Sequence, residues 1–403
     1  MSAYEARKGN GRAQPWGDDP LGYLIAPNGA EDFFDRIYER EPLVVTREDR
    51  ERFSPLLSIE SIDELLAGVD LREGSVDVTD ATREIPRDVY VSSEGYVDRG
   101  VIAHQHRQGA TIIVQQLHAW DPTLADFCRA LESVFSCHVQ TNIYVTPPNA
   151  QGFKTHYDNH DVFVLQIAGE KRWRLYDRPV DTPFRGEQFQ SGRHKPGAVS
   201  HEFVLKAGDV AYVPRGLMHD ADTSGDETSL HITTGLIVRT WADLMLEAVS
   251  EVALNDPAFR TALPPGYAGR GFDRTKAQEH FRKLARSIGE KAQMDASFDL
   301  SVDNFIRSRA PNTRGAITDV SRPIGDGDRF RARKFVPWRL AEDGDKLVLI
   351  AAGGDVDFDH EDRATLERVL EGEAFGLGDL GRDDAEDVVR RLQAFGLVER
   401  VSA

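Results

Sequence analysis

Three side chains that can bind a metal ion constrain this chain more than any other feature. His156 and Asp158 are two residues apart, so in an extended segment both side chains leave the same face and can bind one ion. Further along, a turn-rich run from Gly208 ends at a third candidate, His219. Two imidazoles and one carboxylate on one side of a metal leave its other positions open, an arrangement typical of non-haem Fe(II) sites. The pattern therefore predicts a metal site with room for a co-substrate and dioxygen.

The same segments resemble a known protein family. The similarity rests on His156-x-Asp158, on the run from Asp161 to Tyr176, and on the Gly-Asp-x-x-Tyr-x-Pro-x-Gly-x-x-His pattern that ends at His219. These motifs are similar to the JmjC branch of the cupin superfamily and, more narrowly, to the ribosomal oxygenases. The resemblance implies a mostly β core with α additions. This would be a double-stranded β-helix, or jelly roll, followed by a helical dimerisation region and a C-terminal winged-helix domain.

The resemblance also implies an activity. Ribosomal oxygenases are 2-oxoglutarate-dependent protein hydroxylases, so Fe(II), 2-oxoglutarate as co-substrate and dioxygen are expected. The expected substrate is a side chain such as Arg or His in a ribosomal protein. Other readings stay open: the same chemistry on a small molecule or a biosynthetic peptide, a non-catalytic cupin that binds a protein or small molecule, and a transcriptional regulator acting through the winged helix.

Lys171 is the candidate partner for the co-substrate. On the strand expected over 171–176, Lys171, Trp173 and Leu175 share one face. If that face points into a barrel, the lysine needs an anion, because an unpaired buried charge is costly. The resemblance places the family's co-substrate lysine at this position, paired with the distal carboxylate of 2-oxoglutarate. The alternative is a lysine at the end of a hairpin whose ammonium group reaches water.

Four further polar residues are candidates for the same pocket. Asn142 and Tyr144 lie two apart on the strand expected before the metal motif, and so face the same way. The resemblance assigns matching Asn and Tyr positions to the pocket for 2-oxoglutarate or the peptide. Thr233 is the candidate on a later strand, although the sequence alone does not separate it from Thr234.

The other histidines are expected to have different roles. His160 follows Asp158 by two residues and is interpreted as a rim residue with a substrate role. Most of the rest, His231 among them, are expected to be packing or surface residues.

Length and pattern divide the chain into four expected parts, because 403 residues exceed what one hydrophobic core usually holds. These parts are a flexible N-terminal tail over 1–30, the catalytic JmjC/cupin domain over 31–245 with its core motifs in 100–245, the helical dimerisation region over 246–308, and the winged-helix-like domain over 309–403.

Apolar periodicity and turn residues predict the local elements. Helices are expected over 31–39, 58–66, 123–135, 241–254, 275–288, 363–372 and 385–395, with Ser61 and Glu64 as a capping box in the second of these. An edge strand is expected at 42–45, a hairpin from strands 162–167 and 171–176, and strands at 334–340 and 346–351. Between 70 and 109 the pattern indicates only short strand-like pieces.

The net charge of −18, from 67 acidic and 49 basic residues, argues against general binding to nucleic-acid phosphates. Such a field would steer a basic partner such as a ribosomal protein, although most of this charge is expected only to keep the protein soluble. From Asp355 onward acidic residues outnumber basic ones fourteen to six, so DNA binding by the last part is not expected. Apolar stripes on the helices after Thr240 favour a homodimer.

Two absences bear on location. No apolar run reaches the length of a bilayer span, and residues 1–30 lack the pattern of a secretory signal, so a cytoplasmic protein is expected.

Cys128 and Cys137 are interpreted as buried thiols rather than as a disulfide.

Overall fold

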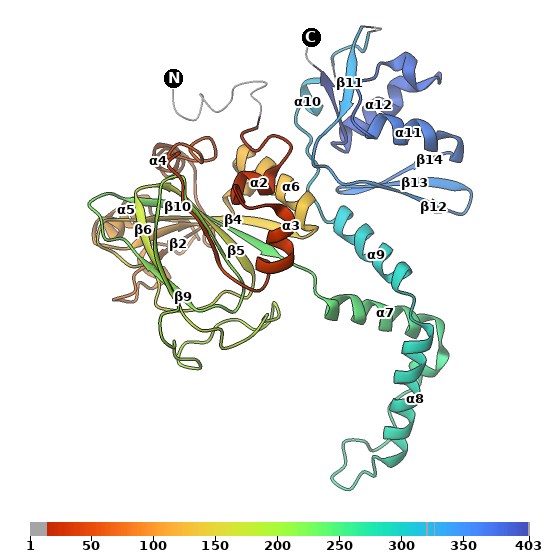
Figure 1. Cartoon of the computed structure of the whole chain (residues 1–403). Coiled ribbons are helices and arrows are strands. Elements are labelled where there is room, and N and C mark those ends of the chain that lie inside the picture. Colours follow the sequence, from red (N-terminus) through yellow and green to blue (C-terminus); the bar gives the residue numbers. More distant parts are fainter. Residues whose placement is uncertain (1–13, 320, 326, 402–403) are drawn as a thin grey trace. The chain divides into compact units, whose positions relative to one another are not determined.

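The computed structural model describes residues 14–319, 321–325 and 327–401. The chain divides into two compact units, the first ending at Val238 and the second beginning at Arg239 (Figure 1). The helices that directly follow the first unit therefore belong with the C-terminal residues. Among the described residues, no helix is both long enough and apolar enough to cross a lipid bilayer.

The first unit contains two antiparallel sheets and several short helices. In chain order its elements are α2 (Pro20–Ile25), α3 (Ala30–Asp32), the π-helical turn η1 (Phe33–Ile37), β1 (Leu43–Val45), α4 (Ile59–Gly68), β2 (Val76–Thr79), η2 (Arg87–Val89), α5 (Arg99–Arg107), β3 (Thr111–Val114), η3 (Leu117–Ala119), α6 (Pro122–Phe135), β4 (His138–Thr146), β5 (Asp161–Ala168), β6 (Glu170–Leu175), β7 (His201–Lys206), β8 (Val210–Val213), β9 (His219–Asp222) and β10 (Ser229–Ile237).

The two sheets face each other across a shared core. The larger has the order β1-β8-β5-β10-β4-β3-β2 and the smaller the order β7-β6-β9, with neighbouring strands antiparallel. Val162 and Val164 of β5 pack in one buried cluster with Trp173 and Leu175 of β6. Side chains from both sheets therefore enclose the interior in which the candidate site lies. The expected edge strand at 42–45 is confirmed by β1.

Aromatic packing covers the outer face of the larger sheet. Phe163 of β5 stacks on Phe33 of η1 with ring centroids 5.8 Å apart, and Phe135 of α6 and Tyr212 of β8 complete the group. Because alternate residues of a strand point to opposite faces, β5 places valines inside and Phe163 outside. The strand is buried on both faces for this reason.

The expected hairpin of 162–167 and 171–176 is wrong. β5 pairs with β10 and β8, whereas β6 pairs with β7 and β9 in the other sheet. Gly169, at φ 63°, carries the chain from one sheet to the other, and a Cβ there would lie 2.5 Å from the carbonyl oxygen of Thr228. A tight turn between two strands looks the same in the sequence whether the strands pair or separate.

Other local expectations have mixed outcomes. The helix expected at 123–135 is confirmed by α6, and both cysteines are buried and outside any disulfide, as expected. The helix at 58–66 is confirmed by α4, but Ser58 and Ser61 form its capping box instead of Ser61 and Glu64. Helix α5 was not expected in 70–109.

The expected N-terminal tail also differs from the structure in its described part. Trp16 is buried and 20–25 form α2, so from Trp16 onward the chain packs into the first unit. The part of that expectation over residues 1–13 lies outside the described residues.

The second unit begins with three helices and ends in a small α/β region. Its elements are α7 (Trp241–Asn255), η4 (Pro257–Arg260), α8 (Thr275–Lys291), α9 (Met294–Arg307), α10 (Ala316–Asp319), β11 (Arg329–Ala332), β12 (Arg339–Asp343), β13 (Lys346–Ala351), β14 (Gly354–Phe358), η5 (His360–Asp362), α11 (Arg363–Leu370), η6 (Leu377–Leu380), α12 (Ala385–Ala394) and β15 (Val398–Val401).

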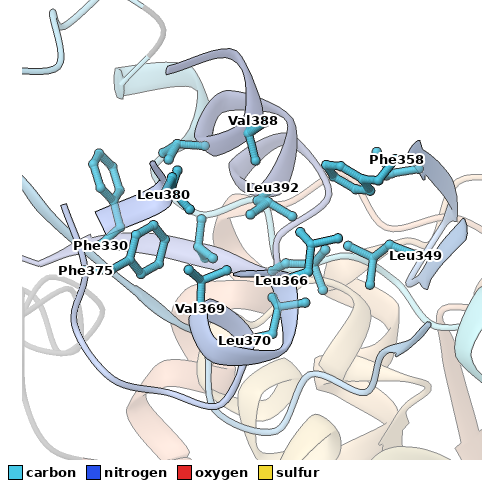
Figure 2. Packing of buried hydrophobic residues seen from close by; sticks show 14 of the residues in the cluster. Phe330, Leu349, Phe358, Leu366, Val369, Leu370, Phe375, Leu380, Val388 and Leu392 are labelled. Atoms are coloured by element: carbon cyan, nitrogen blue, oxygen red, sulfur yellow. The ribbon is translucent and has the colours of Figure 1, made fainter. Parts of the chain in front are cut away.

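A separate apolar core holds the C-terminal region together. Leu366 and Leu370 of α11 and Leu392 of α12 meet Leu349 of β13 and Phe330 of β11 in this core (Figure 2). The expected helices at 241–254, 275–288, 363–372 and 385–395 and the strand at 346–351 are confirmed. The strand expected at 334–340 begins only at residue 339, and α9 was not expected.

Candidate metal centre and co-substrate cavity

A two-hydrogen-bond bridge brings the two candidate histidine ligands together. The backbone N–H of His156 donates to the carbonyl of His219 over 3.0 Å, and the N–H of His219 donates to the carbonyl of His156 over 2.7 Å. His219 opens β9, while His156 lies in the loop after β4. Residues far apart in the sequence are thus fixed opposite each other by backbone geometry.

The ring nitrogens of both histidines are oriented by neighbouring carbonyl groups. Nδ1 of His156 lies 2.9 Å from the carbonyl oxygen of Lys154, and Nδ1 of His219 lies 2.9 Å from that of Leu217. Because a carbonyl oxygen can only accept, each Nδ1 carries the hydrogen and each Nε2 keeps its lone pair. A metal-binding histidine usually makes such a hydrogen bond through the ring nitrogen that does not bind the metal, and this bond fixes the orientation of the ring.

Asp158 completes the group. Its Oδ1 lies 3.9 Å from Nε2 of His156, and its Oδ2 lies 3.8 Å from Nε2 of His219. One ligand atom from each of the three residues lies within 4.8 Å of the others. Two imidazole nitrogens with free lone pairs and one carboxylate suit a divalent metal such as Fe(II).

The charges around the cluster keep it ready to bind a cation. Burial alone would raise the pKa of Asp158, but the neighbouring imidazoles of His160, His219 and His156 outweigh it and hold that pKa below its usual value. Burial, followed by the proximity of His156, lowers the pKa of His219. Asp158 is therefore ionised and His219 neutral near pH 7, which are the forms that bind a metal.

Contacts behind the cluster hold the two ligand segments in place. The N–H of Gly216 donates to the carbonyl of Asp158, and a Cβ at Gly216, where φ is 82°, would lie 2.1 Å from the carbonyl oxygen of Val180. Asp220, next to His219, accepts hydrogen bonds from the hydroxyls of Thr155 and Tyr176. The ligand positions are thus tied to β6, to β9 and to each other.

Lys171 lies in the same interior cavity as the three ligand candidates. It is 4% exposed, and its ammonium donates to the hydroxyl of Thr146 over 3.0 Å. Burial lowers the pKa of Lys171 to about 7, which the charge of Asp222 only partly offsets. A buried lysine that meets one hydroxyl and no adjacent carboxylate among the described residues is suited to bind an anion.

The remaining cofactor candidates differ in position. Tyr144 and Thr233 line the cavity, whereas Thr234, on the opposite face of β10, does not. Asn142 is opposite Thr233 in the strand register, but its side-chain oxygen accepts from the N–H of Gln116 and the residue is not part of the cavity lining. The role expected for Asn142 in the pocket stays a prediction.

Two further histidines near the site have different outcomes. His160 lies outside the metal cluster, as expected, and it packs so tightly on β10 that a Cβ at Gly235 would come within 2.6 Å of its ring. His231, expected to be a packing or surface residue, lines the cavity beside Lys171. Strand alternation already carried this signal, since His231 and Thr233 are two apart and share a face.

The lining contains buried polar atoms that no described residue satisfies. They are Nδ1 of His231 and Nε1 of Trp173. Lys171, whose ammonium meets only the hydroxyl of Thr146, is the donor that suits a small anion in the cavity next to the metal cluster. Strand alternation placed Trp173 on the same inward face as Lys171, but nothing in the sequence pattern singled out the supporting Asp220.

The geometry predicts which substitutions abolish metal binding. His219→Ala removes one of three ligands and is expected to weaken Mn(II) or Fe(II) binding by at least about 10-fold, a loss that isothermal titration calorimetry measures. His201→Ala, at an exposed position of β7, is the control, and this variant is expected to bind metal like the wild-type chain. Equal losses in the two variants would contradict the assignment of the cluster.

Comparisons with known proteins indicate the family of this chain. A family model described as a JmjC domain matches residues 114–244. Ribosomal oxygenase 1 of Gallus gallus is 32% identical over 310 residues, covering 72% of this chain and 51% of the relative. The bifunctional lysine-specific demethylase and histidyl-hydroxylase NO66 of Drosophila mojavensis is 34% identical over 312 residues, covering 72% and 35%. The chain spans about half the length, or less, of these curated relatives.

The solved structure of Escherichia coli ribosomal oxygenase YcfD in complex with cobalt and 2-oxoglutarate has the same fold. Its TM-score is 0.53 at 16% identity, and the alignment covers 94% of this chain and 99% of that chain. This likeness confirms an antiparallel JmjC/cupin core with a helical segment and small C-terminal sheets. Residues 114–244 are therefore a JmjC domain, and the chain is a homologue of the proteins named ribosomal oxygenase 1 and NO66.

Proposed function

We propose that this chain is an Fe(II)- and 2-oxoglutarate-dependent oxygenase that hydroxylates a side chain, Arg or His, of a ribosomal protein. The observation that carries the proposal is the convergence of His156, Asp158 and His219 in a cavity that also holds the buried Lys171. A non-catalytic cupin would not need this ligand set together with a buried anion partner. The names of the relatives support the ribosomal substrate.

Each residue of the site has a role in this proposal. His156, Asp158 and His219 hold Fe(II) on one side, and Lys171 pairs with the distal carboxylate of 2-oxoglutarate. Tyr144 and Thr233 line the same space and position the co-substrate. When bound, Fe(II), 2-oxoglutarate and dioxygen supply the oxidation: one oxygen atom enters an unactivated C–H bond of the substrate, and the other enters succinate as carbon dioxide leaves.

A groove beside the metal cluster is large enough to hold a segment of a protein substrate. It has a volume of about 760 Å³ and is lined by segments 78–85, 152–159 and 188–191. The groove shares Phe153, His156 and Asp158 with the cavity, so a chain segment lying in it would reach the metal. The polar loop between β6 and β7 supplies one of its walls.

The excess of acidic residues in the chain would attract a basic ribosomal protein.

The second unit is assigned supporting roles. We infer that the first unit, up to Val238, is the catalytic domain in place of the expected 31–245, that the helices of 241–308 mediate dimerisation, and that 309–403 form a winged-helix-like domain for protein contact rather than for DNA. The acidic balance of that domain supports the last assignment. A ribosomal substrate fits the cytoplasmic location that the sequence predicts.

The pH dependence of co-substrate binding tests the role of Lys171. With a pKa of about 7 in the free protein, the ammonium loses its proton as the pH rises, and the charged fraction falls roughly tenfold per unit above that value. The KM for 2-oxoglutarate is therefore expected to rise between about pH 7 and 9, as measured by succinate release. Lys171→Arg, whose guanidinium stays charged, is expected to show a flat profile over this range. A flat wild-type profile would contradict the role.

Intact-mass comparison of ribosomal proteins tests the substrate. Cells without this gene are expected to lack one oxygen atom's mass on one ribosomal protein. The wild-type gene is expected to restore that mass, and the Asp158→Ala gene is not. If no ribosomal protein changes mass while the purified chain releases succinate from 2-oxoglutarate, the substrate lies elsewhere and the ribosomal assignment is wrong.

Exposed apolar side chains on α7 to α9 support a homodimer. Trp241 is 75% and Phe281 71% exposed, and further large apolar residues are exposed on the same helices: Met245, Leu246, Leu254, Met294 and Phe298. So much apolar surface is typical of a protein interface. The wild-type chain is expected to sediment as a dimer. The Phe281→Glu variant is expected to dissociate into monomers more readily, because a charge replaces an apolar contact. The Lys283→Glu variant, on the same helix, is the control and is expected to remain a dimer. A monomeric wild-type chain would contradict this proposal.

A further inference from the structure

Tyr157 lies between two of the candidate metal ligands in the sequence, but its side chain is on the other face of their segment. His156 and Asp158 line the interior cavity and Tyr157 does not, as the alternation of side chains along an extended segment requires. Tyr157 is nevertheless only 4% exposed. The residues that cover its ring therefore show what the ligand segment is attached to.

The ring of Tyr157 is covered by the loop between β6 and β7 (176–200). Phe189 meets it with ring centroids 5.4 Å apart and planes 84° apart, and His194 meets it at 6.1 Å and 60°. The hydroxyl of Tyr157 also donates to the carbonyl of Glu187 over 3.4 Å. Two aromatic side chains and one carbonyl group of the loop thus lie around a single tyrosine.

The rest of this loop has few other attachments. From 184 to 200, all of which the structure describes, Phe189 and His194 are the only residues that are not exposed. Hydrogen bonds attach the loop near its ends, at Arg185, Gly197 and Ser200. A segment with so few buried contacts detaches at a low free-energy cost. The middle of the loop therefore depends on the ring of Tyr157 for its position.

The same part of the loop forms a wall of the groove beside the metal cluster. Gln188, Phe189 and Ser191 line this groove together with 152–159. Phe189 also meets the ring of His156, with centroids 6.4 Å apart. The wall of the groove is therefore positioned by the segment that carries two of the three candidate metal ligands.

We infer that Tyr157 couples the metal site to the groove. A metal bound to His156 and Asp158 fixes the residue between them, and the fixed ring of Tyr157 holds the loop in place as the groove wall. This inference rests on the proposed function and adds a way in which its substrate groove is regulated. Because coupling between two sites is reciprocal, a loop held in place also strengthens metal binding. Tyr157 is in this respect a positioning residue, which acts through the residues on either side of it.

Limited trypsin digestion of the full chain tests this coupling, with Mn(II) as the metal. Trypsin cuts after arginine, and Arg185 and Arg193 are exposed in the loop. Arg270, exposed between η4 and α8 of the second unit, is the internal control. Saturating Mn(II) is expected to slow cleavage in the loop by about 5-fold or more, the lower end of typical coupling between sites, and to leave cleavage after Arg270 unchanged. Mass spectrometry of the products measures each rate.

Matched aromatic variants locate the coupling. Phe189→Ala removes a ring that packs on Tyr157, so Mn(II) is expected to protect its loop no longer. Because the coupling is reciprocal, this variant is also expected to bind Mn(II) more weakly, by the factor of protection that is lost. Phe184→Ala removes a ring of the same loop that is 54% exposed, and it is expected to behave like the wild-type chain.

Variants of Tyr157 itself separate the ring from the hydroxyl. Tyr157→Phe keeps the ring and is expected to retain the protection, whereas Tyr157→Ala is expected to lose it. The double variant with Phe189→Ala is expected to bind Mn(II) no more weakly than Tyr157→Ala alone, because both changes remove the same contact.

The results that contradict this inference differ from those that contradict the proposed function. Equal cleavage of the wild-type loop with and without Mn(II), when calorimetry shows that Mn(II) binds, would overturn the inference. So would a Phe189→Ala variant that keeps both the protection and the affinity, and this test remains if Tyr157→Ala does not fold. A wild-type chain that does not bind Mn(II) would instead overturn the proposed function, on which the inference rests.

Discussion

The site depends on the pair of backbone hydrogen bonds between His156 and His219. They join a loop to the start of β9 and set two imidazoles on one side of Asp158. The carbonyl groups of Lys154 and Leu217 then fix which nitrogen faces the carboxylate. The ligand geometry is thus built into the backbone, and a metal ion would bind to positions that already exist. Preorganisation of this kind keeps the cost of ordering the ligands low.

The cavity next to the cluster is lined by buried polar side chains that lack the partners such groups have in a packed interior. Lys171 and His231 are both buried, and neither meets an adjacent carboxylate among the described residues. Leaving such groups without an anion costs stability, since desolvation favours their neutral forms. A diacid that chelates a metal through one end and pairs with Lys171 through the other would supply both a ligand for the metal and an anion for the lysine. The fold therefore contains an unfavourable arrangement that a bound diacid would relieve.

Local spacing made part of this site predictable from the sequence. His156 and Asp158 are two apart, and the same alternation placed Lys171 inward with Trp173 and Leu175. The same alternation also places His231 on the face of Thr233, although the sequence interpretation did not extend it to that residue. The failed hairpin has a different cause: the partners of β5 and β6 lie far away in the chain, and no local pattern reveals them. Asp220 carries no signal at all, because its partners Thr155 and Tyr176 come from other segments.

The central claim is that one iron ion and one 2-oxoglutarate bind together at His156, Asp158 and His219. Anaerobic titration of the full chain with Fe(II) and 2-oxoglutarate, followed by visible absorption, tests it directly, because a keto acid chelated to Fe(II) produces a charge-transfer band that neither component shows alone. The account predicts that this band appears at one equivalent of iron and saturates with 2-oxoglutarate. Iron binding without any band, at saturating 2-oxoglutarate, would contradict it.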